Sequence, residues 1–228
     1  NRLNRDKKIH KNVLAFINVP GWVGDPREDL QVRLKSKEKF DTPLEVPFIT
    51  HWLHNMTHDQ VLDMLKYLGM GNRPEDKVKV IFVPCYQDGH DGILNKHYYD
   101  LILGEDLSVY PSYYEPWGYT PLESVAFRVP TITTDLAGFG LWVNSLKNQH
   151  GINDGVEVLH RSDYNYSEVA DGIKDTVALF STKTEAEIKE IRKRAGQVAE
   201  QALWKHFIQY YYEAYDIALR NAMKRQLK

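Results

Sequence analysis

The apolar positions of this chain fall into short runs that end at glycine, proline or polar clusters. These runs predict strands at residues 13–19, 77–83, 107–110, 130–134 and 155–160. The segments between them carry helical spacing or helix-start signals and predict helices at residues 61–68, 98–103, 121–128, 139–147 and 167–181. Because strands and helices alternate, we expect an α/β fold, a Rossmann-like parallel sheet with helices on both faces.

The last part of the chain has a different pattern. From Thr184 to Gln226 there is no proline and one glycine, and apolar residues recur at helical spacing. This pattern predicts long helices, with a break near Trp204 where a second apolar stripe begins. We therefore expect a Rossmann-like domain at residues 1–183 and a C-terminal helical segment at residues 184–228.

Two places carry helix-start signals. Thr120, Pro121 and Glu123 predict a helix that begins at Pro121, with Thr120 as N-cap and Glu123 closing a capping box. Thr57 and Gln60 predict the same arrangement before the helix at residues 61–68. The first turn of a helix has unpaired backbone N–H groups and the positive end of its dipole, so the start at Pro121 could hold a phosphate.

Two glutamates, Glu115 and Glu123, lie on either side of that helix start and are separated by seven residues. These two residues alone favour a structural explanation over a functional one, with Glu123 as a cap and Glu115 as a solvated loop carboxylate. Aromatic side chains with polar tips crowd the same turn and suit the wall of a pocket that packs on a sugar or a base. They are Tyr113, Tyr114, Trp117 and Tyr119.

The turn belongs to a longer motif. YPSYYEPWGYTPLE at residues 110–123 and VPTITTDLAGFG at residues 129–140 resemble the signature of glycogen synthases of the animal, fungal and related bacterial type. The resemblance implies the second, nucleotide-sugar-binding domain of a GT-B fold. It also implies the donor-binding half of a retaining glucosyltransferase, which elongates α-1,4-glucan (glycogen) from UDP-glucose or ADP-glucose.

The resemblance also implies roles for single residues. Glu115 is the expected catalytic residue, which would bind the glucosyl hydroxyls and support positive charge at the anomeric carbon. Glu123 would accept hydrogen bonds from the ribose, and Tyr98 would stack on the base. The backbone at the helix start would meet the distal phosphate, and the scheme needs neither a metal nor a cofactor besides the donor. The remaining expected nucleotide-sugar-binding residues are Trp117, Gly118, Tyr119 and Thr120.

Other parts of the family's site have no counterpart in this sequence. The resemblance implies an upstream domain that contacts most of the glucan acceptor, and an Arg and a Lys that bind phosphate just before the matched region. We expect both to lie outside this chain, so the chain alone should bind weakly and not turn over. A homo-oligomer of the full-length protein is compatible with the sequence.

Two other kinds of function compete with a glucosyltransferase. A glycoside hydrolase also uses two carboxylates, but they must flank one bond at about 5 to 9.5 Å, which spacing in sequence does not establish. A non-catalytic nucleotide-sugar or glucan binding module would need the pocket without the chemistry. Measured affinities for a nucleotide-sugar donor and for a glucan would distinguish the binding module from a glucosyltransferase.

Composition excludes several partners. The formal net charge is −2 with lysines and glutamates interspersed, so we expect no nucleic acid partner. No apolar stretch approaches the ~20 residues of a membrane helix, and the polar start has no signal-peptide core, so we expect a cytoplasmic protein without membrane contact. The one cysteine, Cys85, excludes a disulfide framework within the chain.

Two groups of residues have a spacing that could suggest a metal. His51, His54 and His58 are close in sequence, but without cysteines we interpret them as loop histidines and not as zinc ligands. The segment 87–92 carries Asp88 and Asp91 between glycines but lacks the further carboxylates of a calcium loop, so we expect a surface turn. We predict no metal site.

Overall fold

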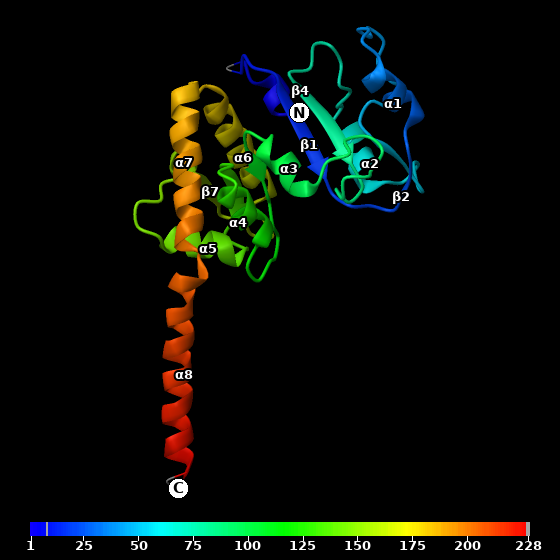
Figure 1. The fold of residues 1–228 in the computed structure, drawn as a ribbon. Helices are drawn as coiled ribbons and strands as arrows, with labels where there is room; N and C mark the ends of the chain where they lie inside the picture. The colour runs from blue at the N-terminus through cyan, green and yellow to red at the C-terminus, as the bar shows by residue number, and fades with distance from the viewer. Residues whose placement is uncertain (8, 227–228) are drawn as a thin grey trace. The chain divides into compact units, whose positions relative to one another are not determined.

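The computed structural model describes residues 1–7 and 9–226, which form two compact units. The first unit contains residues 1–105 and 170–183, and the second contains residues 106–169 and 184–228 within the described ranges. Figure 1 colours the elements of both units in chain order. Each unit is described by itself.

The first unit contains two pairs of strands. β1 (Val13–Asn18) runs parallel to β4 (Val78–Val83), with Val13 opposite Val78. Both strands were expected, and both end within one residue of the predicted bounds. The second pair joins β2 (Val23–Pro26) to β3 (His51–Leu53) in antiparallel orientation and was not predicted, because three or four residues give too short a pattern.

Four helical elements lie wholly in the first unit: η1 (Leu3–Arg5), α1 (Glu28–Lys35), α2 (Gln60–Tyr67) and α3 (Tyr98–Leu103). α2 corrects a prediction. Its N-cap is Asp59, whose Oδ1 accepts hydrogen bonds of 2.9 Å from the backbone N–H groups of Val61 and Leu62, whereas Thr57 is exposed. An aspartate in the extended conformation directly before the first turn reaches these donors, and Thr57 is too far upstream. The helix buries Leu62 and Leu65 against β4 residues in the core.

The second unit is built on one parallel sheet in the order β5-β6-β7. The strands are β5 (Ser108–Val109), β6 (Thr131–Thr134) and β7 (Val156–Leu159), each inside a predicted range. α4 (Tyr119–Ala126) packs on β5 and β6, while α5 (Gly138–Ser145) packs on β6 and β7. The short helix η2 (Ile152–Asp154) precedes β7.

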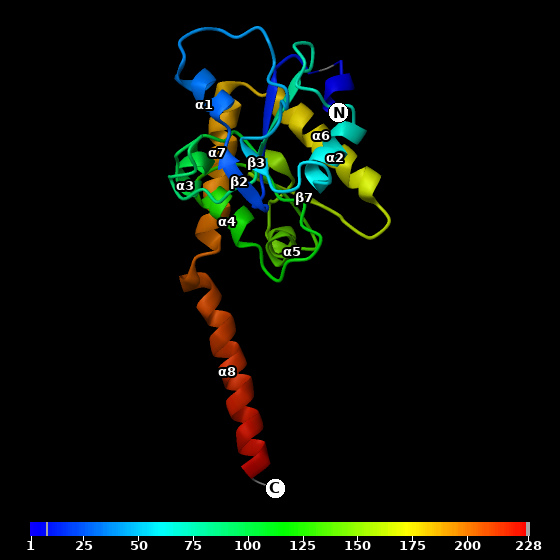
Figure 2. The ribbon, with the colours of Figure 1, turned by 90° about the vertical axis from the view of Figure 1, so that its right-hand side faces the viewer.

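Three long helices form the C-terminal part of the described chain. α6 (Tyr166–Ser181) crosses the boundary between the units at Val169, and α7 (Glu185–Gln201) packs on α4 with Ala195 and Val198 in the core. α8 (Trp204–Gln226) begins after the break predicted near Trp204. In Figure 1 and Figure 2 alike, α8 continues from the end of α7 as a rod.

The side chains of α8 are mostly exposed. Its exposed aromatic side chains are Trp204, Tyr210, Tyr211, Tyr212 and Tyr215. Among the described residues, no helix is both long enough and apolar enough to cross a bilayer.

The predicted fold class is confirmed: the chain is α/β, with parallel strands, helices on both sides and long C-terminal helices. The parallel strands form two separate sheets, one in each unit. The division into a domain at residues 1–183 and a helical segment at residues 184–228 stays a prediction.

Candidate functional site

The segment Tyr110–Gly118, which we term the signature loop, connects β5 to α4. It leaves β5 at the carboxyl end of the parallel sheet, where the Tyr110 N–H donates 2.8 Å to the Ile132 carbonyl. The Tyr110 hydroxyl lies 2.7 Å from Ser124 Oγ and so fastens the start of the loop to α4. In open α/β sheets, ligands bind outside the carboxyl ends of the strands. The loop therefore lies on the side of the sheet where a ligand is expected.

Glu115 is fixed through its backbone. Its N–H donates 3.1 Å to the Leu136 carbonyl, and its own carbonyl accepts 3.1 Å from the Gly138 N–H, which makes a parallel bridge with Ala137. The half-buried side chain accepts a hydrogen bond of 3.3 Å at Oε2 from Ser112 Oγ. Glu115 is thus held by the segment that follows β6 and is not a freely moving loop carboxylate.

The start of α4 corrects the second capping prediction. The helix begins at Tyr119, two residues before Pro121, and its N-cap is Gly118 with φ 106° and no side-chain cap hydrogen bond. Thr120 is therefore inside the helix and is not the N-cap. Gly118 permits this because it has no Cβ to disfavour the left-handed conformation. Pro121 is tolerated because the N–H it lacks belongs to the first turn, where no intrahelical acceptor exists.

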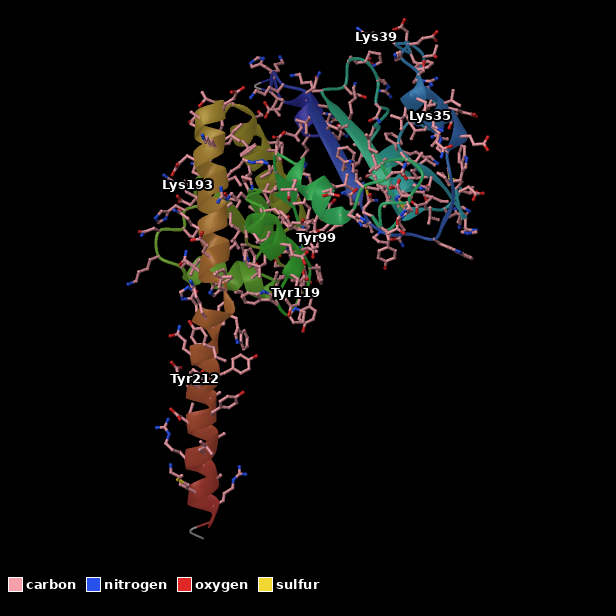
Figure 3. The ribbon with its side chains drawn as sticks, viewed as in Figure 1. Lys35, Lys39, Tyr99, Tyr119, Lys193 and Tyr212 are labelled. Carbon is pink, nitrogen blue, oxygen red and sulfur yellow. The ribbon has the colours of Figure 1, made fainter. Side chains whose placement is uncertain are left out.

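The two helix starts beside the loop differ in how their N–H groups are used. The first turn of α5 is capped by the signature loop: Gly138 N–H donates to the Glu115 carbonyl and Phe139 N–H donates 2.6 Å to the Trp117 carbonyl. The start of α4 has no side-chain cap hydrogen bond from the described residues, and Tyr119, the first residue of this helix, is 70% exposed. Figure 3 shows the Tyr119 side chain extending from this point. The start of α4 can therefore accept an anion.

Six of the seven predicted site residues lie at this corner of the second unit. Glu115, Trp117 and Gly118 are in the signature loop, and the remaining three are in the first five residues of α4. Those three are Tyr119, Thr120 and Glu123, of which Glu123 is half-buried. Tyr98, at the first position of α3, is in the other unit, and its ring lies 5.5 Å from that of Tyr99. Its stacking on a base stays a prediction.

Trp117 is half-buried and packs against the hydrophobic core of the second unit. Its ring is 6.2 Å from Phe139, 5.9 Å from Trp142 and 5.4 Å from Phe207, measured between centroids. The contacts with Phe139 and Phe207 are edge-to-face, a geometry that stabilises aromatic packing. Trp117 therefore anchors the signature loop to α5 and α8. Its predicted contact with a nucleotide sugar stays a prediction.

Comparison with known proteins decides the family. The family profile described as "Glycogen synthase" matches residues 30–228. The chain belongs to the glycogen synthase family. It is 32% identical over 183 residues to glycogen [starch] synthase isoform 1 of Saccharomyces cerevisiae, covering 80% of this chain and 26% of the yeast protein. It is 30% identical over 193 residues to the glycogen [starch] synthase of Neurospora crassa, covering 85% and 27%.

A mammalian relative shows the same coverage. The chain is 27% identical over 200 residues to the liver glycogen [starch] synthase of Mus musculus, which covers 86% of this chain and 28% of the mouse protein. The chain thus spans about a quarter of the length of these relatives, 26% to 28%.

Three residues at the glycogen synthase signature were not singled out from the sequence: Asp135, His160 and Arg161. Asp135 Oδ2 lies 2.6 Å from His160 Nδ1, and its Oδ1 accepts 2.9 Å from the Arg161 N–H. Arg161 Nη1 donates to the Pro111 carbonyl, and the guanidinium lies 5.1 Å from the centre of the Tyr113 ring. The sequence signal that could have found them is their position: each residue lies within two residues of the carboxyl end of β6 or β7, where a ligand is expected.

In the first unit of this glycogen synthase chain, three side chains of the types that bind metals lie close together. Ligand atoms of His51, Cys85 and Asp91 lie within 4.8 Å of one another. His51 already uses both ring nitrogens, with Thr50 Oγ1 at 2.9 Å and the Asp91 carbonyl at 2.6 Å. Burial, most of all, raises the pKa of the Cys85 thiol and disfavours the thiolate that binds metals.

Asp91, the third member of that group, is also occupied. Its Oδ1 accepts hydrogen bonds from the Ile93 and Leu94 N–H groups, and its Oδ2 accepts from Asn95. These contacts are those of a turn, as expected for residues 87–92. We interpret the group as structural, and the absence of a metal stays a prediction.

Proposed function

We propose that this chain is the donor-binding half of a retaining glucosyltransferase that elongates α-1,4-glucan from UDP-glucose or ADP-glucose. The observation that carries the proposal is the corner where Glu115, paired by its backbone with residues 136–138, lies beside the uncapped start of α4. Membership of the glycogen synthase family supports the same reaction. We further propose that the protein acts in the cytoplasm and uses neither metal nor cofactor.

Each part of the corner has a task in this reaction. Transfer breaks the bond between the anomeric carbon and an oxygen of the distal phosphate, which leaves with the electron pair. A bond forms from that carbon to the oxygen of an acceptor hydroxyl, whose proton passes to the departing phosphate. The ionised Glu115 carboxylate accepts hydrogen bonds from glucosyl hydroxyls and stabilises the positive charge that develops at the anomeric carbon. The N–H groups of Gly118, Tyr119 and Thr120 meet the departing phosphate, which gains negative charge.

The nucleotide would extend away from that phosphate. In this proposal Glu123 accepts hydrogen bonds from the ribose hydroxyls and Tyr98 stacks on the base, with Trp117 supporting the loop. The glucan acceptor would bind mainly to residues outside this chain, in keeping with the 26% of the yeast relative that the chain covers.

The test is donor binding by isothermal titration calorimetry, with UDP-glucose, ADP-glucose and UDP as separate ligands. We expect saturable binding of one nucleotide sugar and at least about a tenfold loss of affinity in Glu115→Gln, since a charge-assisted hydrogen bond is removed. Glu200→Gln, at an exposed position of α7, is the matched control and should bind like the wild type.

Two results would contradict the proposal. One is the absence of binding by every nucleotide ligand. The other is saturable binding of maltooligosaccharides without binding of a nucleotide sugar, which would favour a non-catalytic glucan-binding module.

A further inference from the structure

The first half of the signature loop is held by groups outside the loop. Residues 111–114 belong to no strand or helix, so their carbonyls need other donors. Arg161 Nη1 donates to the Pro111 carbonyl, and Thr134 Oγ1 donates 2.6 Å to the Ser112 carbonyl. Both donors lie at or just beyond the carboxyl ends of β6 and β7.

Arg161 makes a second contact with the same part of the loop. Its guanidinium carbon is 5.1 Å from the centroid of the Tyr113 ring, within the range of a cation–π interaction. One planar group thus holds the loop at two residues, Pro111 and Tyr113. A lysine could donate to Pro111 but would not present a planar group to the ring.

Arg161 is itself fixed by Asp135. One carboxylate oxygen accepts 2.9 Å from the Arg161 N–H, and the other lies 2.6 Å from His160 Nδ1. The Asp135 N–H in turn donates 3.1 Å to the Leu159 carbonyl. These bonds tie the end of β6 to the end of β7, so the base of the Arg161 side chain has a defined position.

The contact reaches the predicted catalytic carboxylate through Ser112. The Ser112 backbone lies between the two residues that Arg161 holds, and its Oγ donates 3.3 Å to Glu115 Oε2. A displacement of residues 111–113 would therefore move the hydroxyl that orients Glu115.

We propose that Arg161 is a positioning residue for Glu115: it holds Pro111 and Tyr113, and through Ser112 it orients the carboxylate that binds the glucosyl group. This inference rests on the proposed function for the role of Glu115. The clamp itself, Arg161 on residues 111–113, can be tested without any ligand.

The first experiment measures amide hydrogen exchange by NMR in the unliganded chain. We expect Arg161→Ala to speed exchange of the Ser112 and Glu115 amides about tenfold, because these hydrogen bonds depend on the loop position. The β6 amides of Thr131 and Thr133 should not change. Arg194→Ala is the control, since Arg194 also links two elements of the unit through a 2.6 Å contact with Asp154. Equal exchange at Ser112 and Glu115 in wild type and Arg161→Ala would overturn the clamp.

The second experiment separates positioning from general damage. We expect Arg161→Ala to lower affinity for UDP-glucose about tenfold and to leave affinity for UDP unchanged, because UDP lacks the sugar that Glu115 binds. Arg161→Lys should recover part of the loss. If both affinities fall equally, the role in positioning Glu115 is wrong.

The two proposals fail in different ways. If the wild-type chain binds no nucleotide sugar, the proposed function fails, and with it the role of Arg161 toward the sugar. The hydrogen exchange result then still supports or overturns the clamp on residues 111–113.

Discussion

Gly138 lies so close to Pro116 that a side chain at this position has no room. A Cβ atom on Gly138 would lie 3.1 Å from the Pro116 carbonyl carbon and overlap its oxygen. The contact is between two backbones, so no side-chain rotation relieves it. It explains why the segment after β6 needs a glycine where it passes the signature loop, since the Gly138 N–H also donates to the Glu115 carbonyl.

Replacing Gly138 by alanine should displace the signature loop. We expect Gly138→Ala to lower the free energy of unfolding by about 1–3 kcal/mol, the usual cost of overpacking a tight contact. Donor affinity should fall as well, because Glu115 is bonded to Gly138. Urea denaturation and calorimetry measure the two effects.

The control is Gly21→Ala. The nearest heavy atom to a Cβ at Gly21 is Pro84 Cβ at 3.7 Å, an ordinary contact, so this variant should be as stable as the wild type. A Gly138→Ala protein with wild-type stability and affinity would contradict the close approach.

The parts of the fold that the sequence predicts are those with a repeating pattern. β1, β4 and α3 match their predicted ranges closely because apolar runs and helical spacing extend over six residues. The β2–β3 pair could not be predicted, because its partners are far apart in sequence and short. The extent of the compact units depends on contacts between distant segments, which no local pattern contains.

In the candidate site, too, the sequence predicts local features but not contacts between distant residues. The motif predicts the glutamate pair and a helix after the loop, but not the first residue of that helix or its N-cap, because a glycine with positive φ has no side-chain signal. Arg161 was missed because its contacts are 50 residues away at Pro111. The sequence predicts Trp117 as a pocket residue, because its packing against Phe207 in α8 is also a long-range contact that no local pattern contains.

Substitutions at Asp59 and Thr57 test which of the two residues caps α2. Asp59→Ala should lower the free energy of unfolding by about 1 kcal/mol, because two N–H groups lose their acceptor. Thr57→Ala, two residues upstream and exposed, should change it by less than about 0.5 kcal/mol. Thermal and urea unfolding of the two variants measure this difference. A larger loss in Thr57→Ala would restore the capping box expected from the sequence.

The buried Arg27 makes stability depend on pH through Asp29. Arg27 is fully buried and meets Asp29 in a 2.5 Å ion pair. The hydrogen bond from Arg27, most of all, lowers the pKa of the Asp29 carboxyl. The folded pKa of Asp29 is below the unfolded value of about 3.9. The contribution of the ion pair to the free energy of unfolding is therefore full above that pH and is lost as the pH falls through the folded pKa.

Asp29→Asn tests this dependence. At pH 7 it should cost more than an exposed ion pair, which is worth at most about 1 kcal/mol, because Arg27 is left buried with its charge. The difference from the wild type should narrow as the pH falls below about 4. Asp63→Asn, in the exposed 4.0 Å pair with Lys66, is the control for urea unfolding at each pH. A difference that stays constant down to pH 2 would contradict the linkage.

Substitutions at Trp117 and Tyr119 should have different effects, although the two residues are close in sequence: the first should lower stability and the second should lower donor affinity. Trp117→Ala removes a ring packed on Phe139, Trp142 and Phe207, so we expect a loss of about 2–4 kcal/mol in the free energy of unfolding. Tyr119→Ala removes a side chain that is 70% exposed and should change stability by less than about 0.5 kcal/mol. Under the proposed function, Tyr119→Ala lowers donor affinity while Trp117→Phe, which keeps an aromatic ring, largely preserves it. Denaturation and calorimetry on the three variants decide the matter, and a Trp117→Ala protein of unchanged stability would return Trp117 to the pocket wall.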